Sequence, residues 1–296
     1  MTRFIPAPLL GILMFILLVV DTLLMALPLY VIALIKYILP MPKWRRFWDK
    51  GVVWFAQLWA KSINLWVRLL LPIRWDEHIL SALDKRRNYL ITSNHQSWND
   101  IVVAICSLGG KVPFFRFFLK DNLKYVPVLG LVWMALDYPF MKRYSKEQLA
   151  KNPHLKGKDL ETTRIACEKY KNTPVSILNY LEGTRFTVQK HAQQQSPYQH
   201  LLRPKAGGFA FVLNSMGDSI DVLLDITIVY PEGAQGLWQL LCGKVRKVVV
   251  QVREVHLPDT LKMGDYENDA NYREALQTWI SQLWQEKDDY IKKVLV

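Results

Sequence analysis

The segment Asn88-Tyr-Leu-Ile-Thr-Ser-Asn-His95-Gln-Ser-Trp-Asn-Asp100-Ile-Val-Val-Ala-Ile105 contains an apolar run, a polar turn and an amphipathic run in immediate succession. Short apolar runs bounded by polar residues are typical of buried strands, and apolar residues at helical spacing indicate a helix packed on a core. The segment therefore predicts a strand over Asn88–Thr92 and a helix over Ser97–Ser107. A histidine lies in the turn between them.

His95 and Asp100 form the candidate chemical pair of this segment. Positions five apart on a helix are about 140° apart around its axis, so the two side chains meet only if His95 precedes the helix. Ser97 as the N-cap residue allows that arrangement. Asp100 then holds one imidazole nitrogen, and the other accepts a proton from an attacking hydroxyl. A strand-end histidine that caps a helix is the alternative, and position alone does not decide between them.

A second histidine and aspartate, His154 and Asp159, share the same spacing. They follow no apolar strand, and their segment is a basic connection that contains proline and glycine. We therefore expect His154 to be a surface residue outside the site, because a two-residue spacing needs its structural context before it indicates chemistry.

The segment Tyr180-Leu-Glu-Gly-Thr-Arg185 follows another apolar run. It is expected at the carboxyl end of a strand, where open α/β sheets gather their sites. Gly183 allows a ligand to approach the backbone, Thr184 offers a hydroxyl, and Arg185 offers a planar group suited to phosphate. Taken alone, a turn closed by a pair between Glu182 and Arg185 explains the same residues.

The chain beyond Pro72 alternates short apolar runs with amphipathic stretches, which predicts a mixed α/β domain over residues 73–296. The segment from Phe186 to Pro204 is polar and rich in glutamine, and we expect a mobile loop there. Strands are predicted over Asn88–Thr92, Val112–Phe118, Tyr138–Met141, Val175–Tyr180, Val222–Val229 and Val245–Val252. Helices are predicted over Ser97–Ser107, Leu123–Leu136, Asp159–Tyr170, Gly207–Met216 and Tyr272–Lys293.

The first 72 residues have a different composition, and we expect them to form membrane-embedded and interfacial helices. From Leu9 to Ile35 the only charged residue is Asp21, and a helix of this span is about 40 Å long, enough for a hydrocarbon core of roughly 30 Å. Pro28 leaves room for a kink or a re-entrant turn. Asp21 is either a functional carboxylate or faces protein or a wet interface. Five basic residues follow the apolar run, against one before it, which predicts a cytoplasmic catalytic domain.

The next segment, Gly51–Leu71, carries one narrow polar stripe on an otherwise largely apolar helix. Such a helix either lies in the membrane interface with its long polar side chains reaching outward, or packs on the catalytic domain. The sequence leaves both possibilities open. The stripe consists of Gln57, Lys61, Asn64 and Arg68.

The composition indicates which classes of binding partner to expect. A net charge of +12 with 51% apolar residues suits anionic lipid head groups or phosphorylated substrates. Nucleic acid is not expected, because the basic residues are dispersed and no nucleic-acid-binding motif is present. Three distant cysteines, Cys106, Cys167 and Cys242, form no CxxC pair, so we expect no disulfide and no metal site.

Four sequence blocks, in order, resemble the glycerolipid acyltransferase family, the group that contains 1-acylglycerol-3-phosphate acyltransferases. The resemblance extends from Asn88 to Pro231. The motif sequence Asn-His-Gln-Ser-Trp and the extended N-terminus look most similar to the branch with lysocardiolipin acyltransferases and bacterial inner-membrane relatives. The four blocks are the NHxSxxD block from Asn94 to Asp100, the lysine-to-glycine stretch from Phe118 to Gly130, the strand Phe140-Met-Lys-Arg143, and the EGTR block from Glu182 to Arg185.

The resemblance implies an α/β fold with a mixed sheet flanked by helices, and a role for each block. His95 is the general base and Asp100 its partner, whereas Arg143 with Glu182, Gly183, Thr184 and Arg185 binds the glycerol phosphate. Backbone donors near the helix start are expected to stabilise the oxyanion. The departures from the family pattern, Tyr180-Leu181 before the EGTR block and Phe186 after it, leave the identity of the acceptor open.

The implied reaction transfers a fatty acyl group from acyl-CoA or acyl carrier protein to the free hydroxyl of a lysophospholipid. The first choice of acceptor is 1-acyl-sn-glycerol-3-phosphate, which gives phosphatidic acid. Lysocardiolipin or lysophosphatidylglycerol are alternative acceptors, and a catalytically inactive membrane scaffold is the alternative to an enzyme. No cofactor beyond the acyl donor is expected, and the expected location is a bacterial inner membrane with the catalytic domain facing the cytoplasm.

Overall fold

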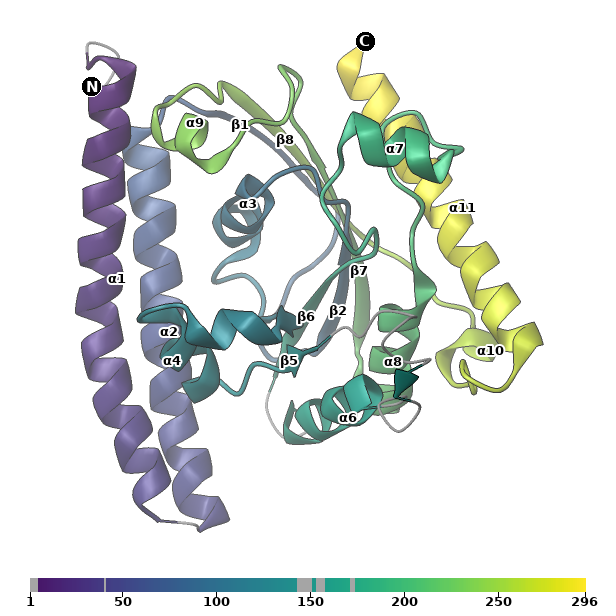
Figure 1. Cartoon of the computed structure of the whole chain (residues 1–296), viewed down its shortest axis with the longest axis horizontal. Helices are drawn as coiled ribbons and strands as arrows, with labels where there is room; N and C mark the ends of the chain where they lie inside the picture. Colours follow the sequence, from purple (N-terminus) through teal and green to yellow (C-terminus); the bar gives the residue numbers. More distant parts are fainter. Residues whose placement is uncertain (1–4, 40, 143–150, 153–157, 171–173) are drawn as a thin grey trace.

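The computed structural model describes residues 5–39, 41–142, 151–152, 158–170 and 174–296. At its centre lies a six-stranded sheet in the order β1-β8-β7-β2-β6-β3 (Figure 1). β7 and β8 are antiparallel and the other neighbouring pairs are parallel, so the expected mixed sheet is confirmed. The strands are β1 (Arg74–Ile79), β2 (Tyr89–Ser93), β3 (Phe115–Arg116), β6 (Ser176–Tyr180), β7 (Val222–Val229) and β8 (Lys247–Glu254).

Helices cover both faces of this sheet (Figure 1). Because side chains alternate along a strand, Tyr89 and Ile91 of β2 join one hydrophobic core and Leu90 joins the other. The helices on the first face are α1 (Ala7–Ile38), α2 (Pro42–Leu70) and α3 (Asn99–Leu108), and those on the second are α6 (Lys158–Tyr170), α8 (Ala206–Met216) and α11 (Ala270–Leu295). The smaller elements are β4 (Leu119–Lys120), η2 (Asp121–Tyr125), α4 (Leu129–Ala135), β5 (Phe140–Met141), α7 (Val188–Gln194), η4 (Gly217–Ser219), α9 (Leu237–Leu241) and α10 (Asp259–Lys262).

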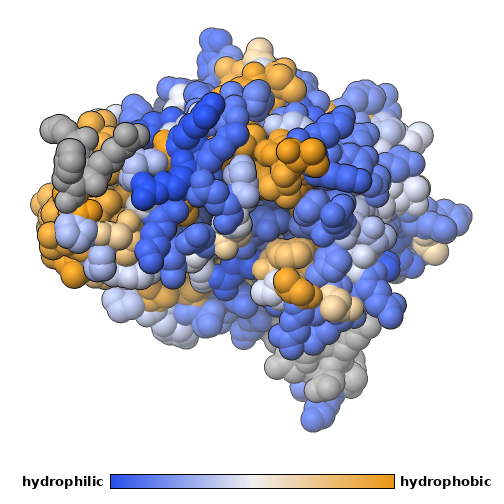
Figure 2. Space-filling model, turned by 90° about the horizontal axis from the view of Figure 1, so that it is seen from above, coloured by the Kyte–Doolittle hydropathy of each residue, from blue (hydrophilic) through white to orange (hydrophobic). Residues whose placement is uncertain are grey.

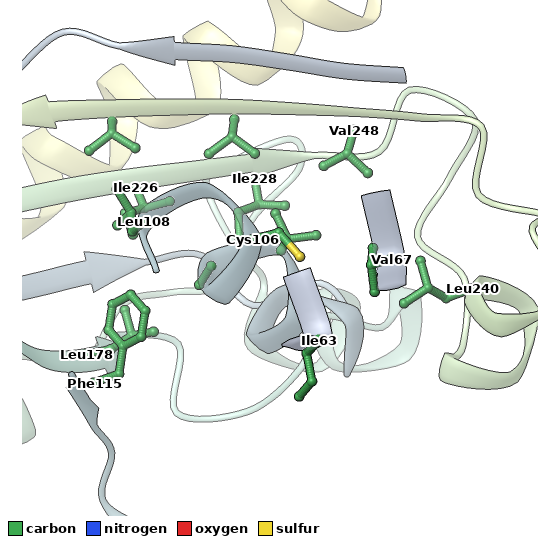
Figure 3. Packing of buried hydrophobic residues seen from close by; sticks show 14 of the residues in the cluster. Ile63, Val67, Cys106, Leu108, Phe115, Leu178, Ile226, Ile228, Leu240 and Val248 are labelled. Carbon is green, nitrogen blue, oxygen red and sulfur yellow. The ribbon is translucent and has the colours of Figure 1, made fainter. Parts of the chain in front are cut away.

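The first core joins the N-terminal helices to the sheet. Ile63 and Val67 of α2 are buried in the same cluster as Cys106 of α3 and Ile228 of β7 (Figure 3). All three cysteines are buried and free, and burial raises the pKa of the Cys106 thiol to about 12. Their burial is typical of cysteines that pack as small hydrophobes.

Three points of the strand prediction need correction, namely one strand that was missed and two that were misplaced or too long. β1 was not predicted, because Arg-Trp-Asp-Glu-His-Ile is polar and lies on an edge strand with no fully buried residue. The long strand predicted over Val112–Phe118 is only the two-residue β3, and the strand predicted over Tyr138–Met141 is β5, which pairs with β4 in a separate two-stranded sheet. The remaining predicted strands agree with β2, β6, β7 and β8 to within about two residues.

The single helix predicted over Leu123–Leu136 is wrong, because the segment forms η2 and then α4. Pro127 lies between them, and the next residue, Val128, has a positive φ of 64°. Gly130 explains the close approach of the two helices, since a Cβ there would meet the carbonyl oxygen of Lys124. The glycine of the lysine-to-glycine stretch is therefore required by packing.

The segment from Phe186 to Pro204, expected to be a mobile loop without regular structure, contains α7. The hydroxyl of Thr187 accepts a hydrogen bond from the backbone of Lys190, which caps the helix start. His191 and Arg203 bond to backbone carbonyls of the same segment. The prediction was wrong because this helix has no apolar stripe, although glutamine favours helices.

The two N-terminal helices lie side by side and antiparallel (Figure 1). Within the described residues α1 is the one helix long and apolar enough to cross a membrane. It continues through Pro28 without a break, so the helix does not turn back there. Exposed apolar side chains extend along its outer face, and Figure 2 shows hydrophobic side chains at the left margin, where its N-terminal end lies. The division into domains at residue 72 stays a prediction.

The structure answers two questions that the sequence left open for these helices, namely where α2 packs and what Asp21 faces. α2 buries Ile63 and Val67 in the core of the α/β domain, so it packs on that domain as well as on α1. Asp21 is 8% exposed and accepts a hydrogen bond from Ser62 of α2 at 2.7 Å. It therefore faces protein. A polar side chain in an apolar helix is stable when it has such a partner.

Candidate active site

His95 lies in a turn of residues 94–98, called here the His95 turn, between β2 and α3. Its Nδ1 is 2.8 Å from Oδ2 of Asp100, in the first turn of α3. The helix begins at Asn99, two residues after the expected N-cap, but the Ser97 hydroxyl still accepts from the Asn99 amide. The geometry required for the two side chains to meet is therefore present.

Asp100 is completely buried and accepts four hydrogen bonds. Its Oδ2 accepts from His95 and from the backbone amides of Gln96 and Ser97 at 2.6 and 2.9 Å, and its Oδ1 accepts from the Tyr230 hydroxyl at 2.7 Å. A carboxylate in the first turn of a helix is also favoured by the helix dipole. These contacts fix the carboxylate and, through it, one nitrogen of the imidazole.

Tyr230 was not identified from the sequence as a site residue. It directly follows β7, the strand beside β2, and that position at the carboxyl end of a neighbouring strand was the available signal. Burial raises the pKa of Tyr230 well above its usual value, and Asp100 raises it further. The hydroxyl therefore stays protonated and donates to Asp100.

The other face of the imidazole packs on Tyr180, the last residue of β6. The two rings are stacked, with centroids 4.1 Å apart and planes 20° apart. Among the described residues none hydrogen-bonds Nε2 of His95, whose side chain is 16% exposed. The ring is thus held on one edge by Asp100 and on one face by Tyr180, and Nε2 is the atom that remains for proton transfer.

Glu182 is buried beneath the His95 turn. Its Oε1 accepts from the His95 amide at 2.8 Å, and its Oε2 accepts from the Leu202 amide at 3.0 Å. Burial raises its pKa to about 8, although both hydrogen bonds lower it. The alternative of a turn closed by Glu182 and Arg185 is excluded, because the carboxylate serves these two backbone amides instead.

The remaining residues of the EGTR block lie beside the His95 turn. The Phe186 amide donates to the His95 carbonyl at 2.8 Å, which ties the two segments together. Gly183 has a φ of 68°, a left-handed conformation that glycine adopts readily. The Lys190 ammonium donates to the Thr184 hydroxyl at 2.7 Å, and the Arg185 guanidinium lies 4.2 Å from the centre of the Trp98 ring.

The oxyanion expectation is wrong for three amides of the helix start. Those of Gln96 and Ser97 donate to Asp100, and that of Asn99 donates to the Ser97 hydroxyl. A donor already bonded inside the turn is not free for a developing oxyanion.

A buried charge cluster lies on β7, the strand beside β2, and the sequence analysis did not predict it. The Lys287 ammonium is 2.8 Å from Asp225 and also donates to the Ile226 carbonyl and the Thr227 hydroxyl. Thr92, three residues before His95, donates to the same carboxylate at 2.8 Å. Burial lowers the pKa of Lys287, and Asp225 opposes that shift.

The candidate phosphate ligand Arg143 lies outside the described residues, and so does His154, which was expected to be a surface residue. In the described part of the chain, no group of three or more His, Cys, Asp or Glu side chains is placed to hold a metal ion. The expectation of a reaction without a metal or further cofactor stays a prediction.

The fold and this site define a class of protein. A buried carboxylate that orients a histidine at the carboxyl end of an α/β sheet is an arrangement suited to general-base chemistry. Residues 74–233 match the family model described as Acyltransferase. The match spans more than half of the chain, so the chain belongs to the acyltransferase family and the resemblance found in the sequence is confirmed.

Curated relatives agree with this family. Human 1-acyl-sn-glycerol-3-phosphate acyltransferase gamma is 25% identical over 250 residues, which cover 77% of this chain and 61% of the relative. Lysocardiolipin acyltransferase 1 of Gallus gallus is 24% identical over 261 residues, or 81% of this chain and 64% of the relative. The chain thus spans less than two thirds of the length of either relative.

A solved structure, the 1-acyl-sn-glycerophosphate acyltransferase PlsC from Thermotoga maritima, is 18% identical with a TM-score of 0.47. The comparison covers 93% of this chain and 98% of that one.

Proposed function

We propose that this protein transfers a fatty acyl group from a thioester donor, acyl-CoA or acyl carrier protein, to the free hydroxyl of a lysophospholipid. The first choice of acceptor is 1-acyl-sn-glycerol-3-phosphate, which becomes phosphatidic acid. The observation that carries the proposal is the hydrogen bond of 2.8 Å between His95 and the fully buried Asp100, at the carboxyl end of the central sheet.

In the proposed step, Nε2 of His95 removes the proton from the acceptor hydroxyl. The hydroxyl oxygen attacks the thioester carbonyl carbon, the new ester C–O bond forms, and the C–S bond breaks. The leaving thiolate takes the proton back from the imidazolium, so protons balance without a covalent enzyme intermediate. Asp100 stabilises the imidazolium while the reaction proceeds.

The acceptor's phosphate is assigned to Arg185 of the EGTR block and to Lys190 of α7. Arg185 lies over the ring of Trp98 in the His95 turn, Lys190 donates to Thr184, and both cations are suited to phosphate oxygens. Arg143 is proposed as a third phosphate ligand on the family resemblance. Glu182 is proposed to act through position, because its two oxygens hold the amides of His95 and Leu202.

Lysocardiolipin or lysophosphatidylglycerol is the second candidate acceptor. The similarity to a lysocardiolipin acyltransferase supports it, and the departure of Tyr180-Leu181 from the family pattern leaves the acceptor open. A larger acceptor head group would need the same base and the same phosphate ligands. The reaction class is therefore unchanged by this choice.

The N-terminal helix is proposed to attach the enzyme to a membrane, with the α/β domain on the cytoplasmic side. The length and apolar surface of α1 support attachment, and Lys36 with the basic start of α2 supports the orientation. A bacterial inner membrane is proposed as the location, on the family resemblance alone. The lipid acceptor would then reach His95 from the bilayer.

The test is an acceptor panel with membranes that contain the full chain. Acyl-CoA and acylated acyl carrier protein, each with a labelled acyl group, are offered separately with lysophosphatidate, lysophosphatidylglycerol and lysocardiolipin. Product from lysophosphatidate alone supports the first choice of acceptor. Product from another lysolipid identifies that lysolipid as the acceptor instead. No product with any pair, from folded protein, would contradict the enzyme proposal and favour the inactive scaffold.

A further inference from the structure

A cavity of about 580 Å³ opens between the end of the helix pair where α1 joins α2 and the β3 edge of the sheet. Residues from the end of α1, the first half of α2, and the starts of β3 and β6 line it. Six of the lining side chains are cations, and this feature gives it the name used here, the basic cavity. These cations are Lys36, Arg45, Arg46, Lys50, Lys85 and Arg116.

Among the residues that the structure describes, one of the six cations has a carboxylate partner. Lys36 is 2.6 Å from Asp49 and 2.7 Å from Asp137, and these are the two carboxylates of the lining. The other five cations form no ion pair with any residue that the structure describes. Like charges gathered in a concave surface raise the local concentration of anions.

Arg116 is the least exposed of the five cations without an ion pair. Its guanidinium lies 5.4 to 5.7 Å from the ring centres of Phe114, Tyr138 and Tyr170. Its Nε and Nη1 atoms are buried and, in the described part of the chain, have no hydrogen-bond partner. Buried donors without partners are unfavourable, and a planar guanidinium is suited to two oxygens of one phosphate.

The basic cavity is separate from the candidate active site. Its sheet residues lie at the start of β6, where Ser176 pairs with Phe115, whereas His95 follows the end of β2, where Ser93 pairs with Tyr180. Tyr180 lies four residues after Ser176 along β6, a distance of about 13 Å. A ligand in the basic cavity therefore does not replace an acceptor at His95.

The rim of the basic cavity is apolar and exposed. Tyr37 and Trp54 line it and are 49% and 57% exposed, and the outward side chains of Leu34, Ile38 and Phe47 on the same two helices are 63 to 69% exposed. Aromatic and basic residues together at the end of an apolar helix are typical of the level of lipid head groups. The anion is therefore expected to carry acyl chains.

We propose that the basic cavity binds the phosphate of an anionic glycerophospholipid, as a site distinct from the acyl-transfer site. Arg116 holds the phosphate from the closed side, and Arg46 and Lys50 hold it from the side of α2. The lipid's acyl chains lie along the exposed face of α1. The bound lipid fixes the helix pair at the membrane surface relative to the sheet.

The test measures equilibrium binding of labelled dihexanoyl phosphatidylglycerol to the full chain in a neutral detergent. Lys50→Gln and Arg116→Gln are each expected to weaken binding about tenfold, the loss of one charge-assisted hydrogen bond. Lys43→Gln is the matched control, because Lys43 is exposed on the same helix and does not line the cavity. Lys50 is exposed, so Lys50→Gln keeps the test valid even if Arg116→Gln fails to fold.

Each other outcome overturns the proposal. Equal binding of dihexanoyl phosphatidylcholine would show that the anionic head group is not recognised, and equal competition by inorganic phosphate would show a site for free phosphate. If Arg185→Ala abolishes binding and Lys50→Gln does not, the lipid binds at the acyl-transfer site. If Lys50→Gln behaves like Lys43→Gln, the cavity does not bind the head group.

Discussion

At the carboxyl end of β2 the carboxylate of Asp100 accepts four hydrogen bonds, whereas at the opposite end of the sheet five cations of the basic cavity have no ion pair among the described residues. In the first region, protein donors satisfy the carboxylate, which holds one imidazole in place. In the second region, the positive charges remain available to bind a ligand. Preorganised groups suit catalysis and unpaired groups suit binding, so the two regions are expected to respond differently to substitution.

Asp100→Asn should have the largest effect. An amide keeps the shape of the carboxylate but loses its charge, so it no longer stabilises the imidazolium. The acyl-transfer rate should fall about 10²- to 10⁴-fold, the range of general-base catalysis. Asp21→Asn is the matched control, because Asp21 is also buried and hydrogen-bonded but lies in α1. Equal rates for the two variants would remove Asp100 from the mechanism.

Lys287→Met tests the buried charge cluster of Lys287 and Asp225. It leaves the buried Asp225 with the Thr92 hydroxyl and with Arg253, whose Nε is 3.4 Å away, so the charge keeps part of its compensation. Removing one partner of a buried ion pair costs about 3–5 kcal/mol, and the free energy of unfolding, measured with denaturant in detergent, should fall by the lower end of that range, about 3 kcal/mol. Lys292→Met, at an exposed position of the same helix, should change it little. An unchanged value for Lys287→Met would show that Asp225 is neutralised in another way.

Glu182 should make stability depend on pH. Burial raises the pKa of Glu182 in the folded protein from its ordinary value of 4.5 to about 8, so the folded protein binds the proton more tightly than the unfolded chain. Its contribution is fully present below about pH 4.5 and is lost as the pH rises through 8, with a slope of at most about 1.4 kcal/mol per pH unit. Unfolding measured between pH 5 and 8 should show this slope in the wild type and a flatter one in Glu182→Gln. Identical slopes would contradict the raised pKa.

Tyr230→Phe should have the smallest effect in this series. Asp100 loses one of its four donors and keeps three, so we expect about a fivefold lower kcat, in line with about 1 kcal/mol for one hydrogen bond. Asp100 with fewer donors should hold the imidazolium more strongly, so the acidic limb of the pH–rate profile, where the base is protonated, should shift upward. Tyr198→Phe, which removes a hydroxyl bonded elsewhere, is the control. A profile that moves equally in both would assign Tyr230 a purely structural role.

The fold was predictable where one segment carried a strong apolar pattern. β2, β6 and β7 were found because each begins with a run of buried residues, and α3 was found because its apolar residues recur at helical spacing. β1 and α7 were not found, because an edge strand and a surface helix bury little and leave no pattern. The break at Pro127 was overlooked because the apolar residues continue on both sides of it.

The candidate site was predictable in its sequence-local part. His95 and Asp100 are five residues apart, and the rule that a histidine before the helix can reach that aspartate needed only helix geometry. Tyr230 and Lys287 reach the same region from 130 or more residues away, through the order of strands in the sheet. The sequence pattern contains no record of that order, so these contacts required the structure.

The most direct measurement of the central claim compares acyl transfer by the wild type and by His95→Ala in the same membranes, with labelled acyl-CoA and lysophosphatidate. The account predicts labelled phosphatidic acid from the wild type and a rate about 10²- to 10⁴-fold lower from the variant. Equal rates from equal amounts of folded protein would contradict the assignment of His95 as the base.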